Sequence, residues 1–231
     1  LLMPTISIVV PCHNESETVS LFLKRLVPVL RSTKETYEFV FVDDGSTDDT
    51  VKKLVALSAK YQHVKIVELS RNFGKEAALT GGLAHARGRA VIPMDCDLQD
   101  PPELIPQMIA QWRLGHKVVH AVRRCRKSDT AAKRITANAF YRLMDSTTDV
   151  KIPSNCGDFR LMDRVVVDAI LKFPERNRFN KGIMAAAGFR GTTVEYDRPE
   201  RSAGHTKFNF WRLWNFALDG VVGFSTIPLR V

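Results

Sequence analysis

The sequence predicts an α/β fold in which helices flank a Rossmann-like, mostly parallel sheet. Three observations lead to this prediction. Short apolar runs recur through the first half of the chain, amphipathic stretches separate them, and each of the first four runs ends in polar residues. Apolar strands spaced by helices are typical of βαβ units, whose sheet is buried on both faces.

The strands are predicted from apolar and β-branched runs, and the helices from apolar residues at helical spacing. The predicted strands are Ile6–Val10, Glu38–Val42, Val64–Leu69, Ala90–Met94 and Val118–Val122. The predicted helices between them are Val19–Leu30, Thr50–Tyr61, Lys75–Ala86 and Pro102–Leu114. In the less regular second half we expect a helix near Ala131–Met144, a strand near Phe159–Met162 and a helix near Arg164–Leu171. This half is expected to complete the same domain.

The composition is that of an ordinary globular protein with a basic balance. Of 231 residues, 45% are hydrophobic and 26% charged, and the formal net charge is +9. Such a surplus suits an anionic partner, whether nucleic acid, an acidic membrane surface or a phosphorylated substrate. The four cysteines, of which none forms a C-x-x-C pair, indicate free thiols in a reducing compartment.

Two carboxylates follow the fourth apolar run one residue apart. If the strand continues through them, Asp95, Asp97 and Gln99 project to the same side. Two carboxylates and an amide oxygen suit a hard cation, Mg²⁺ or Mn²⁺, that carries phosphates. The alternative interpretation of this D-x-D motif is an acidic surface turn.

Polar residues also follow the other early strands. They are Pro11–Glu15 after the first, Asp43–Ser46 after the second and Arg71–Lys75 after the third. In an open α/β sheet, ligands bind beyond the carboxyl ends of the strands. The sequence therefore predicts a nucleotide site there. Because it lacks G-x-G-x-x-G and G-x-x-x-x-G-K-[ST], a dinucleotide dehydrogenase or a P-loop NTPase is disfavoured.

These motifs resemble the GT-A glycosyltransferases of family 2, and most closely the polyprenyl-phosphate glycosyltransferases. The first three segments that carry the resemblance are VVPCHNE at 9–15, VDDGS at 42–46 and MDCDLQDPPE at 94–103. Three later segments are GDFRLMDR at 157–164, ERNRFNKG at 175–182 and RSAGHTK at 201–207. The residues from 213 to 230 are most similar to the bactoprenol glucosyltransferase branch.

The resemblance implies a GT-A fold and a metal-dependent, inverting transfer. The sugar, expected to be glucose, moves from a UDP-sugar to polyprenyl (undecaprenyl) phosphate, for modification of a cell-envelope glycan such as the O-antigen of lipopolysaccharide. It implies Mg²⁺ or Mn²⁺ as cofactor, the membrane surface as partner, no nucleic acid, and leaves a homo-oligomer open. The location implied is the cytoplasmic face of the bacterial inner membrane.

The resemblance also assigns residues to the nucleotide, the metal and the acceptor. Expected at the nucleotide are Pro11, His13, Glu15, Asp44, Lys75, Asp95 and Cys96, although many relatives carry an aromatic residue where His13 stands. Expected at the metal and diphosphate are Asp95, Asp97 and Gln99, with Asp97 foremost. Asp158 is expected near the reacting centre, either as a base or as the group that orients Arg160.

Basic residues are needed to hold two anions together. Arg201 and Lys207 of R-x-x-G-x-x-K can clamp a phosphate from one loop, and Gly204 lets the backbone come close. Arg123 and Arg134 are further candidates, with Arg160 beside Asp158. The plain alternative for each of these cations is a solvated surface position.

We expect a catalytic domain over residues 1–207 and an aromatic, amphipathic juxtamembrane segment over residues 208–231. A buried helix is the alternative for the aromatic segment. No apolar run approaches transmembrane length, and we expect membrane helices in a part of the protein beyond this chain. Two other functions stay open: a soluble family 2 transferase that acts on a glycan hydroxyl, and a non-catalytic module that binds a nucleotide sugar.

Overall fold

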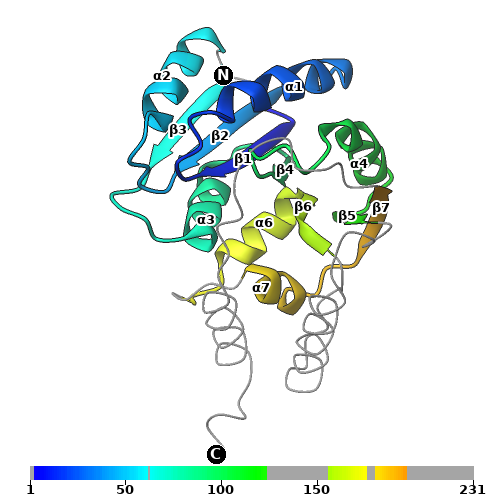
Figure 1. Cartoon of the computed structure of the whole chain (residues 1–231). Coiled ribbons are helices and arrows are strands. Elements are labelled where there is room, and N and C mark those ends of the chain that lie inside the picture. Colours follow the sequence, from blue (N-terminus) through cyan, green and yellow to red (C-terminus); the bar gives the residue numbers. More distant parts are fainter. Residues whose placement is uncertain (1–2, 62, 124–155, 176–179, 197–231) are drawn as a thin grey trace, which may run out of the picture.

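The computed structural model describes residues 3–61, 63–123, 156–175 and 180–196 (Figure 1). Within them one sheet has the strand order β3-β2-β1-β4-β6-β5-β7. The strands are β1 (Ile6–Cys12), β2 (Tyr37–Asp43), β3 (Val64–Glu68), β4 (Ala90–Pro93), β5 (Val118–Arg123), β6 (Cys156–Asp163) and β7 (Gly191–Tyr196). The helices are α1 (Val19–Ser32), α2 (Thr50–Lys60), α3 (Lys75–His85), α4 (Ile105–Arg113), α6 (Arg164–Leu171) and α7 (Asn180–Ala186), with a 3₁₀ turn η1 (Pro102–Leu104).

The sheet is mostly parallel, as predicted. β1 pairs in parallel with β2 and β4, β2 with β3, and β5 with β7. Only β6 runs antiparallel to its neighbours, β4 and β5. The three-strand parallel core around β1 brings the ends of β1, β2 and β4 to one edge of the sheet, which we call the carboxyl edge.

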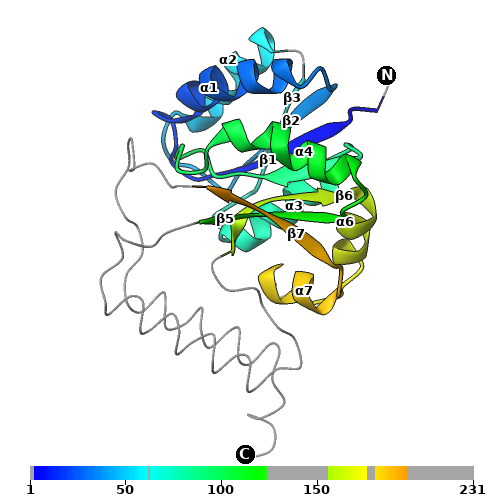
Figure 2. The ribbon, with the colours of Figure 1, turned by 90° about the vertical axis from the view of Figure 1, so that its right-hand side faces the viewer.

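Helices cover both faces of the sheet (Figure 2). On one face α1, α2 and α4 contribute Phe22, Leu54 and Met108 to a buried cluster with Ile8 and Phe41 of the strands. On the other face α3, α6 and α7 contribute to a second cluster, whose members include Leu79, Leu83, Val167, Ile170 and Ile183. Burial on both faces explains why the strands are continuous apolar runs instead of alternating ones.

The D-x-D segment corrects one prediction. The strand was expected to reach Met94 and to continue extended through the carboxylates, but β4 ends at Pro93 and residues 96–97 form a turn. Leu98 has a φ of 60°, in the left-handed region, which breaks the alternation of an extended strand. The expectation that Asp95, Asp97 and Gln99 share one face of a strand is therefore wrong.

Two elements were not predicted at all. α7 has only seven residues, too few for a helical period to show. β7 has the sequence GTTVEY, in which the β-branched residues Thr192, Thr193 and Val194 favour a strand. The predicted helix at Ala131–Met144 lies outside the described residues, as does the juxtamembrane segment at 208–231. Among the helices that are described, none has the length and apolar content to cross a bilayer.

Candidate active site

Backbone hydrogen bonds hold the strand ends together at the carboxyl edge. The N–H of Asp44 donates to the carbonyl of Cys12 at 2.8 Å, and that of Met94 to the carbonyl of Val9 at 2.9 Å. The N–H of Leu69 donates to the carbonyl of Asp43 at 2.9 Å. The polar loops that follow β1, β2, β3 and β4 therefore start from strand ends that hydrogen bonds hold together.

The carboxylate of Asp44 organises the loop between β3 and α3. It is buried, and its two oxygens accept hydrogen bonds from the N–H groups of Phe73 at 2.7 Å and Gly74 at 2.9 Å. The resemblance assigned Asp44 to the nucleotide. Its described contacts show a further task, since it fixes the backbone from which Lys75 begins α3.

Gly45 lets the turn after β2 approach that same loop. Its φ is +64°, and a Cβ at this position would lie 2.5 Å from the carbonyl carbon of Arg71. A left-handed φ is strained for any residue with a side chain, and here the space is also filled by backbone. Glycine is therefore required where the loops after β2 and β3 meet.

The ring of His13 is oriented by the loop after β2. Its Nδ1 lies 2.9 Å from the carbonyl oxygen of Asp44, which can only accept, so Nδ1 carries the proton. The Nε2 atom lies 3.5 Å from the amide nitrogen of Asn14. Asn14, at a φ of 55°, also accepts from the N–H of Thr47 at 2.8 Å, which ties the loop after β1 to the loop after β2.

The next predicted nucleotide residues point partly into the protein. Glu15 accepts a hydrogen bond from the hydroxyl of Thr18 at 2.8 Å, and Pro11 is half-buried on β1. The Cys96 side chain is buried, with its Sγ 3.9 Å from that of Cys12. The hydrogen bond between these thiols and their burial raise the pKa of Cys12 well above its usual range. A contact between the Cys96 thiol and a nucleotide is not supported by this position.

Lys75 connects two carboxylates from different strands. Its ammonium Nζ lies 2.7 Å from Oδ2 of Asp95, just after β4, and 2.8 Å from Oδ2 of Asp158, on β6. The sequence assigned the three residues to the nucleotide, the metal and the reacting centre. The structure brings these three side chains into one cluster.

The charges in this cluster act strongly on one another. Burial alone would lower the pKa of Lys75, but the carboxylates of Asp95 and Asp158 outweigh it and hold that pKa above its ordinary value. The pKa of Asp95 is raised, first by burial and then by repulsion from Asp158 and Asp97, which the attraction of Lys75 only partly offsets. The ammonium of Lys75 thus stays charged while Asp95 and Asp158 share it.

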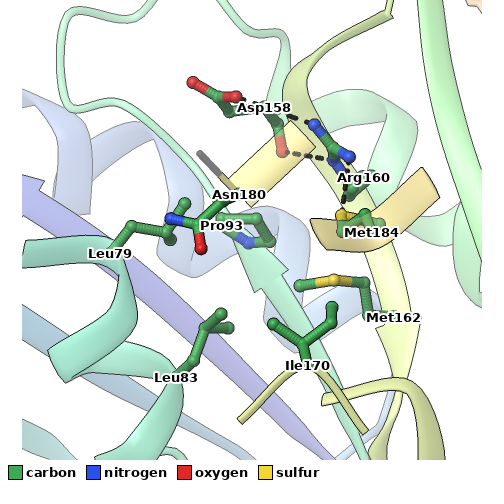
Figure 3. A pocket seen from close by; sticks show the side chains of 9 residues that line it. All are labelled: Leu79, Leu83, Pro93, Asp158, Arg160, Met162, Ile170, Asn180 and Met184. Carbon is green, nitrogen blue, oxygen red and sulfur yellow. Dashed lines mark hydrogen bonds and ion pairs between the residues drawn. The ribbon is translucent and has the colours of Figure 1, made fainter. Parts of the chain in front are cut away.

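Arg160 contacts both the backbone and the side chain of Asp158 (Figure 3). Its guanidinium donates to the carbonyl of Gly157 at 2.7 Å and to that of Asp158 at 3.2 Å, and lies 3.6 Å from Oδ1 of Asp158. Only 7% of the Arg160 side chain is exposed. The two side chains are therefore neighbours with the arginine as the fixed partner, and the expectation that Asp158 orients Arg160 stays a prediction.

A small, mostly apolar cavity lies beside Asp158, Arg160 and Asn180, with its walls from α3, β4, β6, α6 and α7 (Figure 3). The cavity has a volume of ≈ 10 Å³, which is room for about one water molecule. The side-chain oxygen of Asn180 is buried and has no hydrogen-bond partner within the described residues. One ordered water in this cavity would satisfy it.

The residues at the D-x-D turn fit a divalent cation that arrives with a phosphate ligand. No three His, Cys, Asp or Glu side chains of the described part of the chain form a ready-made cage. Mg²⁺ is commonly bound through one or two carboxylates plus substrate phosphates, with waters to complete the shell. Asp95 and Asp97 offer such carboxylates, and an added cation would offset the repulsion between them, which contributes after burial to the raised pKa of Asp95. Gln99 is buried, and its N–H donates to Oδ1 of Asp97 at 3.1 Å.

The structure does not describe the side chains of several predicted cations. Arg123 ends β5, and its side chain is not among those described. Arg134, Arg201 and Lys207 lie outside the described residues. The sequence also missed a contact next to Lys75: Glu76 accepts from the N–H of Asn180 at 2.9 Å and so ties α3 to α7. No local sequence pattern predicts a hydrogen bond between residues so far apart in the chain.

Comparisons with known proteins identify the family. The family model described as glycosyl transferase family 2 matches residues 7–171. An uncharacterised glycosyltransferase of Synechocystis is 51% identical over 226 residues, which are 98% of this chain and 71% of that protein. A bactoprenol glucosyl transferase of Shigella phage SfV is 48% identical over 226 residues, 98% of this chain and 74% of that protein.

The fold also matches a solved structure. Glucosyl-3-phosphoglycerate synthase from Mycobacterium tuberculosis, crystallised with Mn²⁺, UDP and glucosyl-3-phosphoglycerate, aligns with a TM-score of 0.64 over 95% of this chain and 77% of its own. Their identity is 20%, so this likeness concerns the fold, and the expected GT-A fold is confirmed. The family model and the close relatives show that the chain belongs to glycosyl transferase family 2.

Proposed function

We propose that this chain is the catalytic part of a metal-dependent glucosyltransferase that moves glucose from UDP-glucose to polyprenyl phosphate, with undecaprenyl phosphate as the acceptor. The observation that carries the proposal is the identity of 48% over 98% of the chain with proteins named bactoprenol glucosyl transferase. The cluster of Lys75, Asp95 and Asp158 at the carboxyl edge supports it, because the reaction must hold several anions at one point.

The donor side is assigned to the loops after β1, β2 and β4. His13, Glu15 and Asp44 are proposed to bind the nucleoside, and Asp95 and Asp97 would hold Mg²⁺ or Mn²⁺ with the diphosphate. When bound, the metal neutralises negative charge on the departing UDP. The ammonium of Lys75, which contacts Asp95, adds a second positive charge on this side.

The acceptor side is assigned to Asp158 and Arg160. A phosphate monoester is already largely anionic near neutral pH, because its second pKa is about 6. It therefore needs orientation and charge neutralisation more than deprotonation. Arg160 orients Asp158, which takes a proton if the acceptor arrives protonated. Arg123, Arg134, Arg201 and Lys207 are proposed to bind the two phosphate groups.

The membrane surface is the proposed partner, since the acceptor is a lipid. This places the enzyme on the cytoplasmic face of the inner membrane, where UDP-sugars are found, with residues 208–231 at the interface. The basic balance of +9 suits an anionic bilayer.

A donor and acceptor panel tests the reaction itself. The full-length protein, extracted in detergent, is incubated with undecaprenyl phosphate and with UDP-glucose, UDP-galactose, UDP-N-acetylglucosamine or GDP-mannose. We expect label from UDP-glucose in the lipid fraction and little from the other donors. Transfer from UDP-glucose to a soluble glycan in the absence of lipid would instead support the glycan-hydroxyl alternative, and no turnover of any donor would support a binding module.

The metal assignment is tested at Asp97. Because metal charge stabilisation is worth several kcal/mol, Asp97→Ala should lower turnover by about two orders of magnitude or more. It should also weaken the binding of UDP in the presence of Mn²⁺. The matched control is Asp168→Ala on α6, where the side chain is 53% exposed and pairs with Arg164 at 3.6 Å. Wild-type turnover in Asp97→Ala would remove this residue from the site.

A further inference from the structure

We propose that the ammonium of Lys75 and the divalent cation exclude each other at Asp95, so that Lys75 is a tethered counter-ion which must release Asp95 before the metal binds. The proposal rests on the proposed function, because it concerns how that site is loaded. It makes Lys75 a positioning residue for the metal, a role that goes beyond contact with the nucleotide.

The contacts of Lys75 place it where a cation is needed. Its ammonium bridges Oδ2 of Asp95 at 2.7 Å and Oδ2 of Asp158 at 2.8 Å. These carboxylates come from separate parts of the sheet, the end of β4 and the antiparallel strand β6. A single ammonium therefore holds the donor-side carboxylate against the acceptor-side carboxylate.

The two cations of the cluster differ in how freely they can move. Arg160 is 7% exposed and is fixed by hydrogen bonds to the carbonyls of Gly157 and Asp158. Lys75 is 42% exposed and carries its charge on a flexible four-carbon stem. The backbone beneath it is held, because Asp44 binds the N–H of Gly74. Movement is thus confined to the Lys75 side chain.

Exclusion at Asp95 follows from charge. A divalent cation ligated by Asp95 and the ammonium already paired with the same carboxylate repel each other at contact distance. When Lys75 leaves Asp95, Asp158 keeps Arg160 as a neighbouring cation, 3.6 Å away. Asp158 therefore stays neutralised, and its position does not depend on Lys75 alone.

This arrangement couples metal binding to nucleotide binding. Without nucleotide, Lys75 has two carboxylates and no competing anion, and it opposes the metal at Asp95. The diphosphate of the donor supplies the ammonium with a new anionic partner as the metal arrives. Metal and nucleotide are then expected to bind cooperatively, with Lys75 as the element that links them.

The test measures Mn²⁺ binding to the intact protein by electron paramagnetic resonance, with no nucleotide, sugar or lipid present. An opposite charge within 4–6 Å is worth roughly one pKa unit or more to a carboxylate, so Lys75→Met should tighten Mn²⁺ binding by about tenfold. Lys75→Arg keeps the charge and should stay within about twofold of wild type. A residue with only a structural role would weaken Mn²⁺ binding when replaced.

Two comparisons make the result decisive. Lys52→Met is the matched control, because the Lys52 side chain is 84% exposed and pairs with Asp49 at 2.8 Å; its Mn²⁺ affinity should equal that of wild type. Addition of UDP should tighten Mn²⁺ binding more in wild type than in Lys75→Met. Lys75→Gln repeats both measurements if the Met variant does not fold.

Unchanged or weaker Mn²⁺ binding in the neutral variants overturns the proposal. So does an equal effect of UDP in wild type and variant. Because these measurements use neither glucose nor lipid, they are independent of the transfer assay. Tighter Mn²⁺ binding in a protein that transfers no glucose would uphold this inference and contradict the proposed function.

Discussion

The imidazole of His120 lies on β5 beside Arg160, its register partner on β6. Its Nδ1 atom is buried and has no hydrogen-bond partner within the described part of the chain. Gly191 on β7 makes room for the ring, since a Cβ there would lie 2.9 Å from it. Burial, and then the charge of Arg160, lower the pKa of His120 to about 4. The folded protein therefore holds this side chain neutral.

This shift predicts acid sensitivity. In the unfolded chain His120 takes up a proton below about pH 6.5, whereas the folded protein resists protonation down to about pH 4. The contribution of the neutral His120 to the free energy of unfolding should thus be fully present above pH 6.5, and it should decrease as the pH drops from 6.5 towards 4. Urea titrations at pH 7.5 and pH 5 measure how much the free energy of unfolding decreases between the two pH values. This decrease should be smaller in His120→Gln than in wild type by about 1 kcal/mol or more.

The control for this experiment is His116→Gln, at an exposed position after α4. In this variant the free energy of unfolding should differ between the two pH values by the same amount as in wild type. An equal pH dependence in wild type and His120→Gln would show that the neutral imidazole does not contribute.

At the scale of elements, the turn after β2 decides the shape of the donor side. Gly45→Ala adds a Cβ 2.5 Å from backbone of the loop after β3, at a left-handed φ. One of the two loops must move, and the hydrogen bonds from the N–H groups of Phe73 and Gly74 to the Asp44 carboxylate are then lost. We expect UDP binding to weaken at least tenfold, together with a loss of about 1–3 kcal/mol of stability.

Gly115→Ala separates strain from contact. Gly115 has a φ of +102°, follows α4, and has no atom within 4 Å of an added Cβ. Its replacement should cost stability of the order of 1 kcal/mol and leave UDP binding unchanged, as calorimetry can measure. If both variants bind UDP like wild type, the close approach of the two loops has no role in the donor site.

The elements were predictable where burial sets a regular pattern. β1, β2 and α6 follow from apolar runs and helical spacing, because the sheet is covered on both faces. The turn at Asp97 was not predictable from alternation, since it depends on the left-handed φ of Leu98. The same holds for the cluster itself: the motifs named Lys75, Asp95 and Asp158 separately, but only the antiparallel insertion of β6 beside β4 brings Asp158 to Lys75.

At the scale of the whole molecule, the basic balance bears on the proposed membrane partner. With a formal net charge of +9, long-range attraction to an anionic bilayer should contribute to encounter with the lipid acceptor. Such attraction is screened beyond about 8 Å at physiological ionic strength and beyond about 3 Å at 1 M. Transfer to undecaprenyl phosphate in anionic vesicles should therefore slow as salt is raised.

Neutral phosphatidylcholine vesicles that carry the same amount of acceptor provide the comparison. Transfer in them should depend on salt much less, when labelled lipid is counted at low and high ionic strength. Equal salt dependence in both kinds of vesicle would mean that the net charge does not guide the protein to the bilayer.

The strand order has a consequence for synthesis of the chain. The parallel part of the sheet, β3-β2-β1-β4, is complete once residue 93 has left the ribosome, but β4 pairs with β6, which begins at residue 156. During that interval the free edge of β4 exposes unpaired backbone groups beside apolar side chains, a template for wrong pairing with another nascent chain. β6 then closes this edge with its antiparallel run. Aggregation in the cell is thus expected to depend on how quickly the chain is synthesised through β6 and how quickly β6 pairs with β4.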